Sequence, residues 1–205
     1  MNNPFIKASQ IISAVFNPLM VPVYGLAIAL HYSELQVIPL RYKITSLAVV
    51  FVLTGLLPFM LITGMKAVGM VSSVDLTDRR ERTIPFSITL VLYAITAGYF
   101  FFARAPRWLT AFMLGGLLAL VIAMIVNRRW KISAHATGAG ALTAMTLLLA
   151  LHSPAPATML PVITAVLLAS GLTGTARLIL QRHTAGQVYA GFAVGLLAVG
   201  LLTII

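Results

Sequence analysis

Arg177, His183 and Gln187 form the first group of residues whose types and spacing could do chemistry. An Arg and a His that bracket a tight turn between two helices can converge on one phosphate, where the guanidinium binds oxygens and a neutral imidazole attacks phosphorus. Gln187 lies one helical turn after His183, so its side chain can reach the ring nitrogen that is not used for attack. The alternative is an ordinary basic loop, which does not account for this same-face pair.

Lys131, Ser133 and His135 form a second group, at the start of another expected helix. Ser133 is a good N-cap, and the free amides of a first helical turn bind anions through their N–H groups and the helix dipole. Lys131 adds a positive charge nearby. The alternative is a capped helix that carries a His at a membrane interface.

A charged run over residues 75–85 is the third group and contains Arg79 and Arg82. Taken alone, it is typical of a solvated loop of mixed charge between two membrane helices. Its three acidic residues, Asp75, Asp78 and Glu81, are expected to pair with the adjacent arginines. The run acquires functional meaning only together with the other two groups.

The composition indicates which class of protein positions these groups. Hydrophobic residues make up 60% of the 205 residues and charged residues only 9%, which is too few to cover a water-soluble surface. A soluble enzyme, a disordered tail and a secreted mini-protein are therefore excluded. The chain has no cysteine, so disulfides, thiolate metal sites and thiol nucleophiles are excluded as well.

Seven uncharged apolar stretches are long enough to cross a bilayer. They run approximately over residues 8–30, 44–65, 86–103, 108–127, 136–152, 159–176 and 184–205. Because they are continuously apolar and do not alternate, we expect helices and not a barrel. Pro18 and Pro22 predict a kink in the first stretch, which we interpret as a retained span and not a signal peptide. The sequence thus predicts an all-α, polytopic bundle of about seven helices, forming one domain over residues 1–205.

Seven crossings bring the three charged groups to one face of the bundle. Ten of the 14 Lys and Arg residues lie on that face, so the positive-inside rule predicts that it is cytoplasmic, in a bacterial inner membrane. Lys and Arg residues that bind phosphate would also raise the count on that face, whatever its orientation in the membrane. The net charge of +10 is distributed between apolar stretches, which favours lipid phosphate over nucleic acid as the partner.

The order of the three groups resembles the type 2 phosphatidic acid phosphatase superfamily, whose motifs are Lys-x6-Arg-Pro, Pro-Ser-Gly-His and Ser-Arg-x5-His-x3-Asp. Arg177 and His183 match the third motif with its five intervening residues. Ser133 and His135 match the second, although the family's Pro and Gly are replaced. The resemblance covers about residues 75–200 and implies the integral-membrane branch of the family, with a six-helix core as an alternative count.

Two departures from the family pattern are clear. Arg79, Arg82 and Pro85 resemble a shifted version of the first motif, whose spacing is absent. Gln187 stands where the third motif has Asp. A neutral amide can fix the histidine tautomer, but it cannot supply the negative charge that stabilises an imidazolium.

The resemblance implies a lipid phosphatase that needs neither a cofactor nor a metal. His183 would be the nucleophile that forms a phosphohistidine, and His135 would be the general acid and base. The phosphate-binding groups would be Arg177, Arg82, Arg79, Lys131 and the amides near Ser133, with Gln187 orienting His183. Close approach of the two histidine helices would depend on small residues, namely Gly138, Gly140, Gly191 and Gly195.

Two other functions remain open. A non-catalytic binder or transporter of lipid phosphates would use the same cationic pocket without turnover. An intramembrane prenyltransferase would bind diphosphate through Mg²⁺, for which Asp75 and Asp78 give one acidic motif but no second. The candidate substrates are phospholipid or polyprenyl phosphates, namely phosphatidate, phosphatidylglycerophosphate, polyprenyl diphosphate and a lipid A phosphate. The sequence identifies no protein partner.

Overall fold

The computed structural model describes residues 3–153 and 156–203, and within these ranges the chain forms helices and no strands. Seven segments are long and apolar enough to cross a membrane, as the sequence predicts. The elements are α1 (Pro4–Val15), η1 (Pro18–Met20), α2 (Val21–Tyr32), η2 (Glu34–Val37), α3 (Leu40–Val50), η3 (Phe51–Leu56), α4 (Leu57–Ala67), η4 (Arg79–Arg82), α5 (Thr83–Phe102), α6 (Arg107–Asn127), α7 (Ala134–His152), η5 (Pro156–Met159), α8 (Leu160–Ile179) and α9 (Ala185–Thr203). Residues 1–2, 154–155 and 204–205, which belong to the predicted domain, lie outside the described residues.

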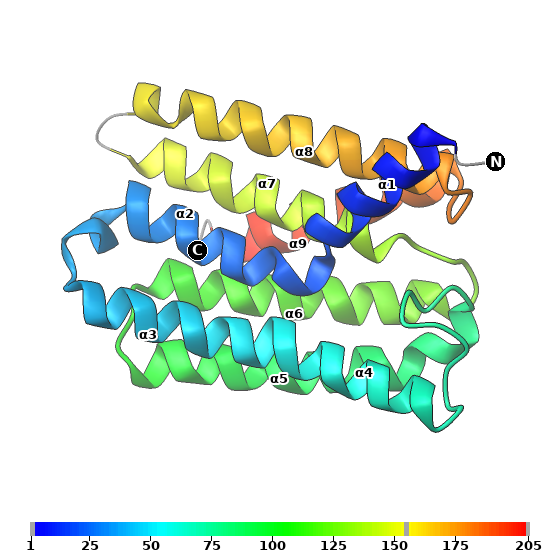
Figure 1. Cartoon of the computed structure of the whole chain (residues 1–205). Helices are drawn as coiled ribbons and strands as arrows, with labels where there is room; N and C mark the ends of the chain where they lie inside the picture. The colour runs from blue at the N-terminus through cyan, green and yellow to red at the C-terminus, as the bar shows by residue number, and fades with distance from the viewer. Residues whose placement is uncertain (1–2, 154–155, 204–205) are drawn as a thin grey trace.

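Most of the long helices lie side by side with their axes roughly aligned, and the links between them gather at the two ends (Figure 1). One end carries the start of α1, the loop over residues 68–78, the link over residues 128–133 and the turn over residues 180–184. We call this the site end, because all three charged groups reach it.

The first span is interrupted where the sequence predicts a kink. The α1 helix ends at Val15, and Asn17 then caps the short η1 segment, its side chain accepting a hydrogen bond from the Leu19 amide. Pro18 has no N–H to donate back into α1, so the helix cannot continue through it. Backbone carbonyls near the end of α1 are therefore available for contacts outside the helix.

Two helical segments extend further than hydropathy predicts, and they include Arg82 and Arg177. Arg82 lies in η4, a helical turn that continues into α5, and Arg177 lies in the last turn of α8. Hydropathy assigned both to loops, because it places every charged residue at a span end outside the helix. Both side chains are instead anchored on regular helical backbone.

The central helix is α7, which packs against α2, α6, α8 and α9. Its contact with α9 is backbone to backbone. A Cβ at Gly140 would overlap the Phe192 carbonyl, one at Gly195 would overlap the Thr137 carbonyl, and one at Gly191 would lie 2.6 Å from the Ser133 carbonyl. The predicted glycine contact between the histidine helices is therefore present. Gly138 departs from the prediction and faces Val21 and Pro18.

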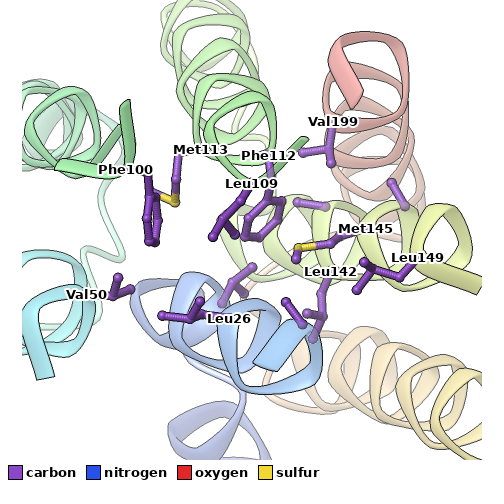
Figure 2. Close-up of a cluster of buried hydrophobic side chains, with 14 of the residues drawn as sticks. Leu26, Val50, Phe100, Leu109, Phe112, Met113, Leu142, Met145, Leu149 and Val199 are labelled. Atoms are coloured by element: carbon purple, nitrogen blue, oxygen red, sulfur yellow. The ribbon is translucent and has the colours of Figure 1, made fainter. Parts of the chain in front are cut away.

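The apolar core lies mainly between α2, α3, α5, α6 and α7. Phe112 and Met113 of α6 meet Leu26 of α2 and Met145 of α7 near its centre (Figure 2). These side chains are almost fully buried, so they stabilise the bundle through dense packing. The packed core fixes the depth of each helix and hence the height of the charged residues at the site end.

We predict that Gly195→Ala lowers the free energy of unfolding by about 1–3 kcal/mol, because the new methyl group overlaps the α7 backbone. Gly200→Ala is the matched control on the same helix, where an added Cβ meets no atom of the described residues within 4 Å. That control should be neutral or slightly stabilising, since alanine favours helix over glycine. Unfolding in detergent measures both, and equal stabilities would contradict the contact.

Candidate phosphate site

A cavity of about 620 Å³ opens at the site end. One part of its wall is polar and includes Ser13, Asp75, Arg82, His135, Arg177, Arg182 and His183. Another part is apolar and includes Met20, Phe51, Leu56, Phe59 and Ile62. We call this the polar cavity. The three groups singled out in the sequence thus contribute side chains to one space.

Arg82 is 4% exposed and all its hydrogen bonds go to neutral oxygens. Its Nε donates to the Leu76 carbonyl at 2.9 Å, and its Nη1 donates to the Ile132 carbonyl at 2.9 Å and to the Asn127 side chain at 3.4 Å. These contacts hold the guanidinium in place without cancelling its charge. A buried charge in this state favours the arrival of an anion.

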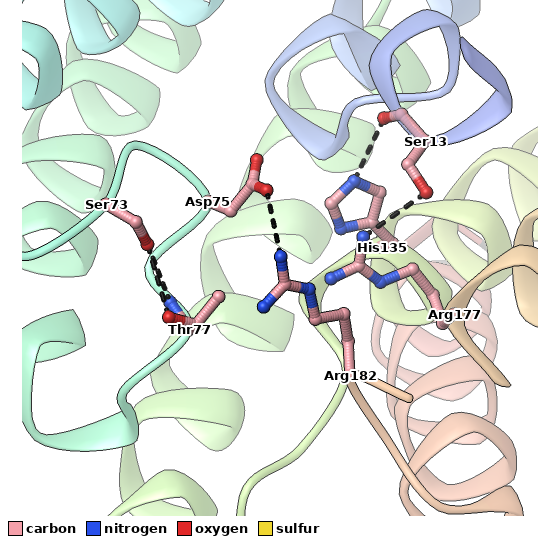
Figure 3. Close-up of polar contacts among 7 residues, drawn as sticks. All are labelled: Ser13, Ser73, Asp75, Thr77, His135, Arg177 and Arg182. Atoms are coloured by element: carbon pink, nitrogen blue, oxygen red, sulfur yellow. Dashed lines mark hydrogen bonds and ion pairs between the residues drawn. The ribbon is translucent and has the colours of Figure 1, made fainter. Parts of the chain in front are cut away.

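Arg177 is also 4% exposed and is less well satisfied. Its Nη1 donates to the Ser13 hydroxyl at 3.2 Å (Figure 3), whereas its buried Nε has no hydrogen-bond partner among the described residues. An unpaired buried donor on a charged group is costly unless a ligand accepts from it. Asp75 attracts the Arg177 charge from a distance without forming an ion pair with it, so this position has a buried charge with no direct carboxylate contact among the described residues and a free donor.

Carboxylates do not neutralise the two buried arginines. Within the described residues the only ion pair joins Arg182 to Asp75 at 3.9 Å, with both side chains partly exposed (Figure 3). Asp78 accepts from the Arg80 amide, and Glu81 accepts from Ser72. The expected pairing of the acidic residues with adjacent arginines is therefore wrong, because helix capping and a contact between loops take its place.

His183 is 8% exposed and presents a defined tautomer. Its Nδ1 lies 3.1 Å from the Gln187 Oε1 and 3.3 Å from the Lys131 carbonyl. The Gln187 oxygen also accepts from the Thr184 amide at 3.3 Å, which identifies it as the oxygen of the side-chain amide. Both neighbours of Nδ1 are thus acceptors, so Nδ1 carries the proton and Nε2 keeps its lone pair.

The pKa of His183 falls to about 4 because of burial, with further lowering from the positive charges of Arg82 and Arg177. The hydrogen bond to Gln187 acts in the opposite direction, and Lys131 lowers the pKa slightly. The imidazole is therefore neutral at physiological pH. A neutral ring with a free Nε2 is the state that a nitrogen nucleophile requires.

His135, in the first turn of α7, has the opposite tautomer. Its Nε2 lies 3.1 Å from the Ser13 carbonyl, so Nε2 is the protonated nitrogen and Nδ1 is free (Figure 3). That carbonyl is available because α1 ends at Val15. Ser13 thus holds His135 with its backbone and Arg177 with its hydroxyl.

The remaining predicted site residues lie behind the cavity wall. Arg79 donates to the Asn127 and Arg128 carbonyls and so caps α6. Ser133 is fully buried and caps α7 by accepting from the Ala136 amide, as predicted. Lys131 contributes its carbonyl to His183, and burial together with the nearby arginines lowers the pKa of its amine. Gln187 contacts His183 as predicted.

Comparison with known proteins adds no relative. No family model, curated protein or solved structure matches the chain.

Sequence reasoning missed Ser13 and Asn127. Ser13 lies 122 positions before His135 and 164 before Arg177, so no local pattern connects them. Asn127 accepts from Arg82, and its own amide donates to the Arg79 carbonyl at 2.8 Å. In the sequence, Asn127 is simply a polar residue at the end of an apolar stretch. Such residues are common at span ends, so its type and position do not indicate a contact with Arg82.

Among the described residues no group of three or more His, Asp and Glu side chains lies close enough to hold a metal ion. The Mg²⁺ site that a prenyltransferase requires therefore has no ready set of ligands here.

We predict that Arg177→Ala weakens the binding of vanadate or sulfate by about 2–4 kcal/mol, because it removes a desolvated, charge-assisted contact. Arg129→Ala removes the same charge from an exposed position near the same end and should have little effect. Isothermal titration calorimetry of the two variants gives the comparison. Equal losses would mean that the anion does not bind at Arg177.

A second prediction concerns the titration of His183. Its pKa of about 4 should rise by at least about one unit when sulfate binds, because the anion offsets Arg82 and Arg177. NMR of ¹⁵N-labelled histidine in detergent micelles follows the ring, with His183→Ala assigning the signal. An unchanged pKa on saturation would mean that the anion binds elsewhere.

Proposed function

We propose that this chain is a multi-pass membrane protein that hydrolyses the phosphate ester of a membrane lipid through a phosphohistidine. The observation that carries the proposal is the pair of buried guanidiniums, Arg82 and Arg177. They line one cavity with His135 and His183, and neither is paired with a carboxylate among the described residues. A phosphate is an anion that such a pair can bind on several oxygens.

Membrane location is supported by the surface of the helices. Many large apolar side chains point outward, including Phe59, Phe101, Phe102, Leu151 and Leu168. Exposure on this scale is unfavourable in water and suits contact with hydrocarbon. The polar cavity then lies near one interface, where a lipid head group would be.

The first chemical step follows from the two tautomers. The Nε2 lone pair of His183 forms a bond to phosphorus while the bond from phosphorus to the lipid oxygen breaks. His135 takes up a proton at its free Nδ1 from the phosphate monoanion of the bound substrate, and it gives that proton to the leaving oxygen. Arg82 and Arg177 bind the phosphoryl oxygens as charge develops on them. The products of this step are a lipid alcohol and a phosphohistidine.

The second step returns the site to its initial state. Nδ1 of His135, now neutral, takes a proton from water while the water oxygen attacks phosphorus. The N–P bond breaks, its electron pair returns to Nε2 of His183, and inorganic phosphate leaves as the monoanion after taking the proton from Nδ1 of His135. Throughout both steps the proton on Nδ1 of His183 stays in its hydrogen bond to Gln187.

Gln187 limits how fast this chemistry can run. When phosphate is transferred to Nε2, the His183 ring becomes positively charged, and a carboxylate beside Nδ1 would stabilise that charge. The amide oxygen of Gln187 supplies only a dipole. This feature favours the second candidate function, a lipid-phosphate binder or transporter that uses the same pocket without turnover.

Phosphate release from a panel of lipid phosphates separates the two functions. The panel contains phosphatidate, phosphatidylglycerophosphate, polyprenyl diphosphate and a lipid A phosphate, each with and without vanadate. Hydrolysis by the purified native protein that stops in His183→Ala would support the phosphatase. Binding without hydrolysis of any member, in both the native protein and Gln187→Asp, would support the binder.

We predict that Gln187→Asp raises turnover, by about tenfold for each 1.4 kcal/mol of added transition-state stabilisation. Gln187→Asn is the matched control, because it has the size of Asp without the charge. It should not exceed the native rate. Equal rates for the Asp and Asn variants would show that charge beside Nδ1 does not limit the reaction.

A further inference from the structure

A second cavity, of about 90 Å³, adjoins the polar cavity and has an almost entirely apolar wall. It lies between η1, α2, α5, α6 and α7, inside the bundle, and no charged side chain lines it. We call it the apolar cavity. Five residues line both cavities, namely Pro18, Leu19, Phe86, Thr89 and Ala134.

The apolar cavity runs along the helices and away from the site end. On α5 its wall extends from Phe86 to Tyr93, which corresponds to about 10 Å of helix. On α7 it uses Ala134, Thr137, Gly138 and Ala141, whose spacing places them on one face of the helix. It meets the polar cavity beside Ala134, which lines both and is the residue next to His135.

The proposed reaction determines what lies beside His135. In-line displacement at phosphorus places the leaving oxygen opposite the nucleophile His183. His135 protonates that oxygen, so the lipid part of the substrate must continue past His135. The apolar cavity begins at that point, and its wall suits hydrocarbon alone.

We propose, on the basis of the proposed function, that the apolar cavity binds a hydrocarbon chain of the leaving lipid alcohol. The substrate would thus place its phosphate between Arg82 and Arg177 and one chain inside the bundle. The inner end of the cavity is lined by Tyr93, Phe112 and Met113, and Ala119 lies on its α6 wall. These side chains would determine how long a chain the cavity accepts.

Two substitutions change the cavity in opposite directions. Ala119→Leu fills it, because Ala119 is buried in its wall. Phe112→Ala enlarges its inner end. Ala94→Leu is the control, because it adds the same side chain at an exposed position of α5. Unfolding in detergent shows which variants are folded.

The experiment compares butyl, octyl and dodecyl phosphate as substrates in detergent, because an extended chain of about eight carbons matches the cavity's length of about 10 Å. We expect Ala119→Leu to lower the kcat/KM ratio of octyl to butyl phosphate about tenfold. Phe112→Ala should shift the preference toward the longer chain, and Ala94→Leu should leave the ratio unchanged. Equal effects on all three chain lengths in both cavity variants would overturn the proposal.

Hydrolysis of para-nitrophenyl phosphate, which has no chain, tests the proposed function separately. If the native protein hydrolyses this ester but shows no chain-length effect in the variants, the chain site is wrong and the phosphatase stands. If it hydrolyses no ester, the phosphatase is wrong. In that case the chain site is tested by binding. The dissociation constants of the three alkyl phosphates are measured by displacement of vanadate, and we expect the two cavity variants to change the preference for chain length in the same directions as for kcat/KM.

Discussion

The contact between α7 and α9 determines the geometry of the whole site. Both helices begin at the site end, and each carries one histidine in or just before its first turn. Because Gly140, Gly191 and Gly195 let the two backbones touch, the starts of the helices are held closer than larger side chains would allow. The Ser133 amide also donates to the Gln187 carbonyl at 3.3 Å, which joins the same two helices by a backbone hydrogen bond. His135 and His183 are thus placed by a rigid pair, and the arginines are brought to them by α5 and α8.

Charge is the second constraint. Arg82 and Arg177 are buried together without a carboxylate partner among the described residues, although isolated buried charges are costly. Hydrogen bonds to backbone carbonyls, Asn127 and Ser13 reduce that cost without removing the charge. Burial lowers the pKa of His183 most, and the same two arginines lower it further, so the ring is neutral. The two buried arginines therefore favour the binding of an anion and also help to keep His183 in the neutral state that a nucleophile needs.

The sequence predicted those features that depend on neighbours along the chain. The seven apolar segments, the break at Pro18, the Ser133 cap and the pair of His183 with Gln187 all follow from spacing within a few residues. It could not predict that Ser13 contacts both His135 and Arg177, because that depends on how α1 lies against α8. It also missed that Arg79 caps α6, since any basic residue near a phosphate motif is a candidate ligand until the fold shows which carbonyls it reaches. The roles that the family resemblance implies for His135 and His183 stay predictions.

The ion pair between Asp75 and Arg182 has a consequence for the catalytic cycle of such an enzyme. Asp75 lines the same cavity as the buried arginines, and its carboxylate is the one acidic group among the described residues of that wall. Any phosphate that reaches Arg182 must compete with Asp75 for it, whether the phosphate is still attached to a lipid or already free. The competition weakens lipid phosphate and free phosphate by the same factor, but the hydrocarbon chain adds affinity that holds the substrate, whereas free phosphate has no such contribution and dissociates. An internal anion of this kind would relieve product inhibition, which a site with several buried cations would otherwise suffer.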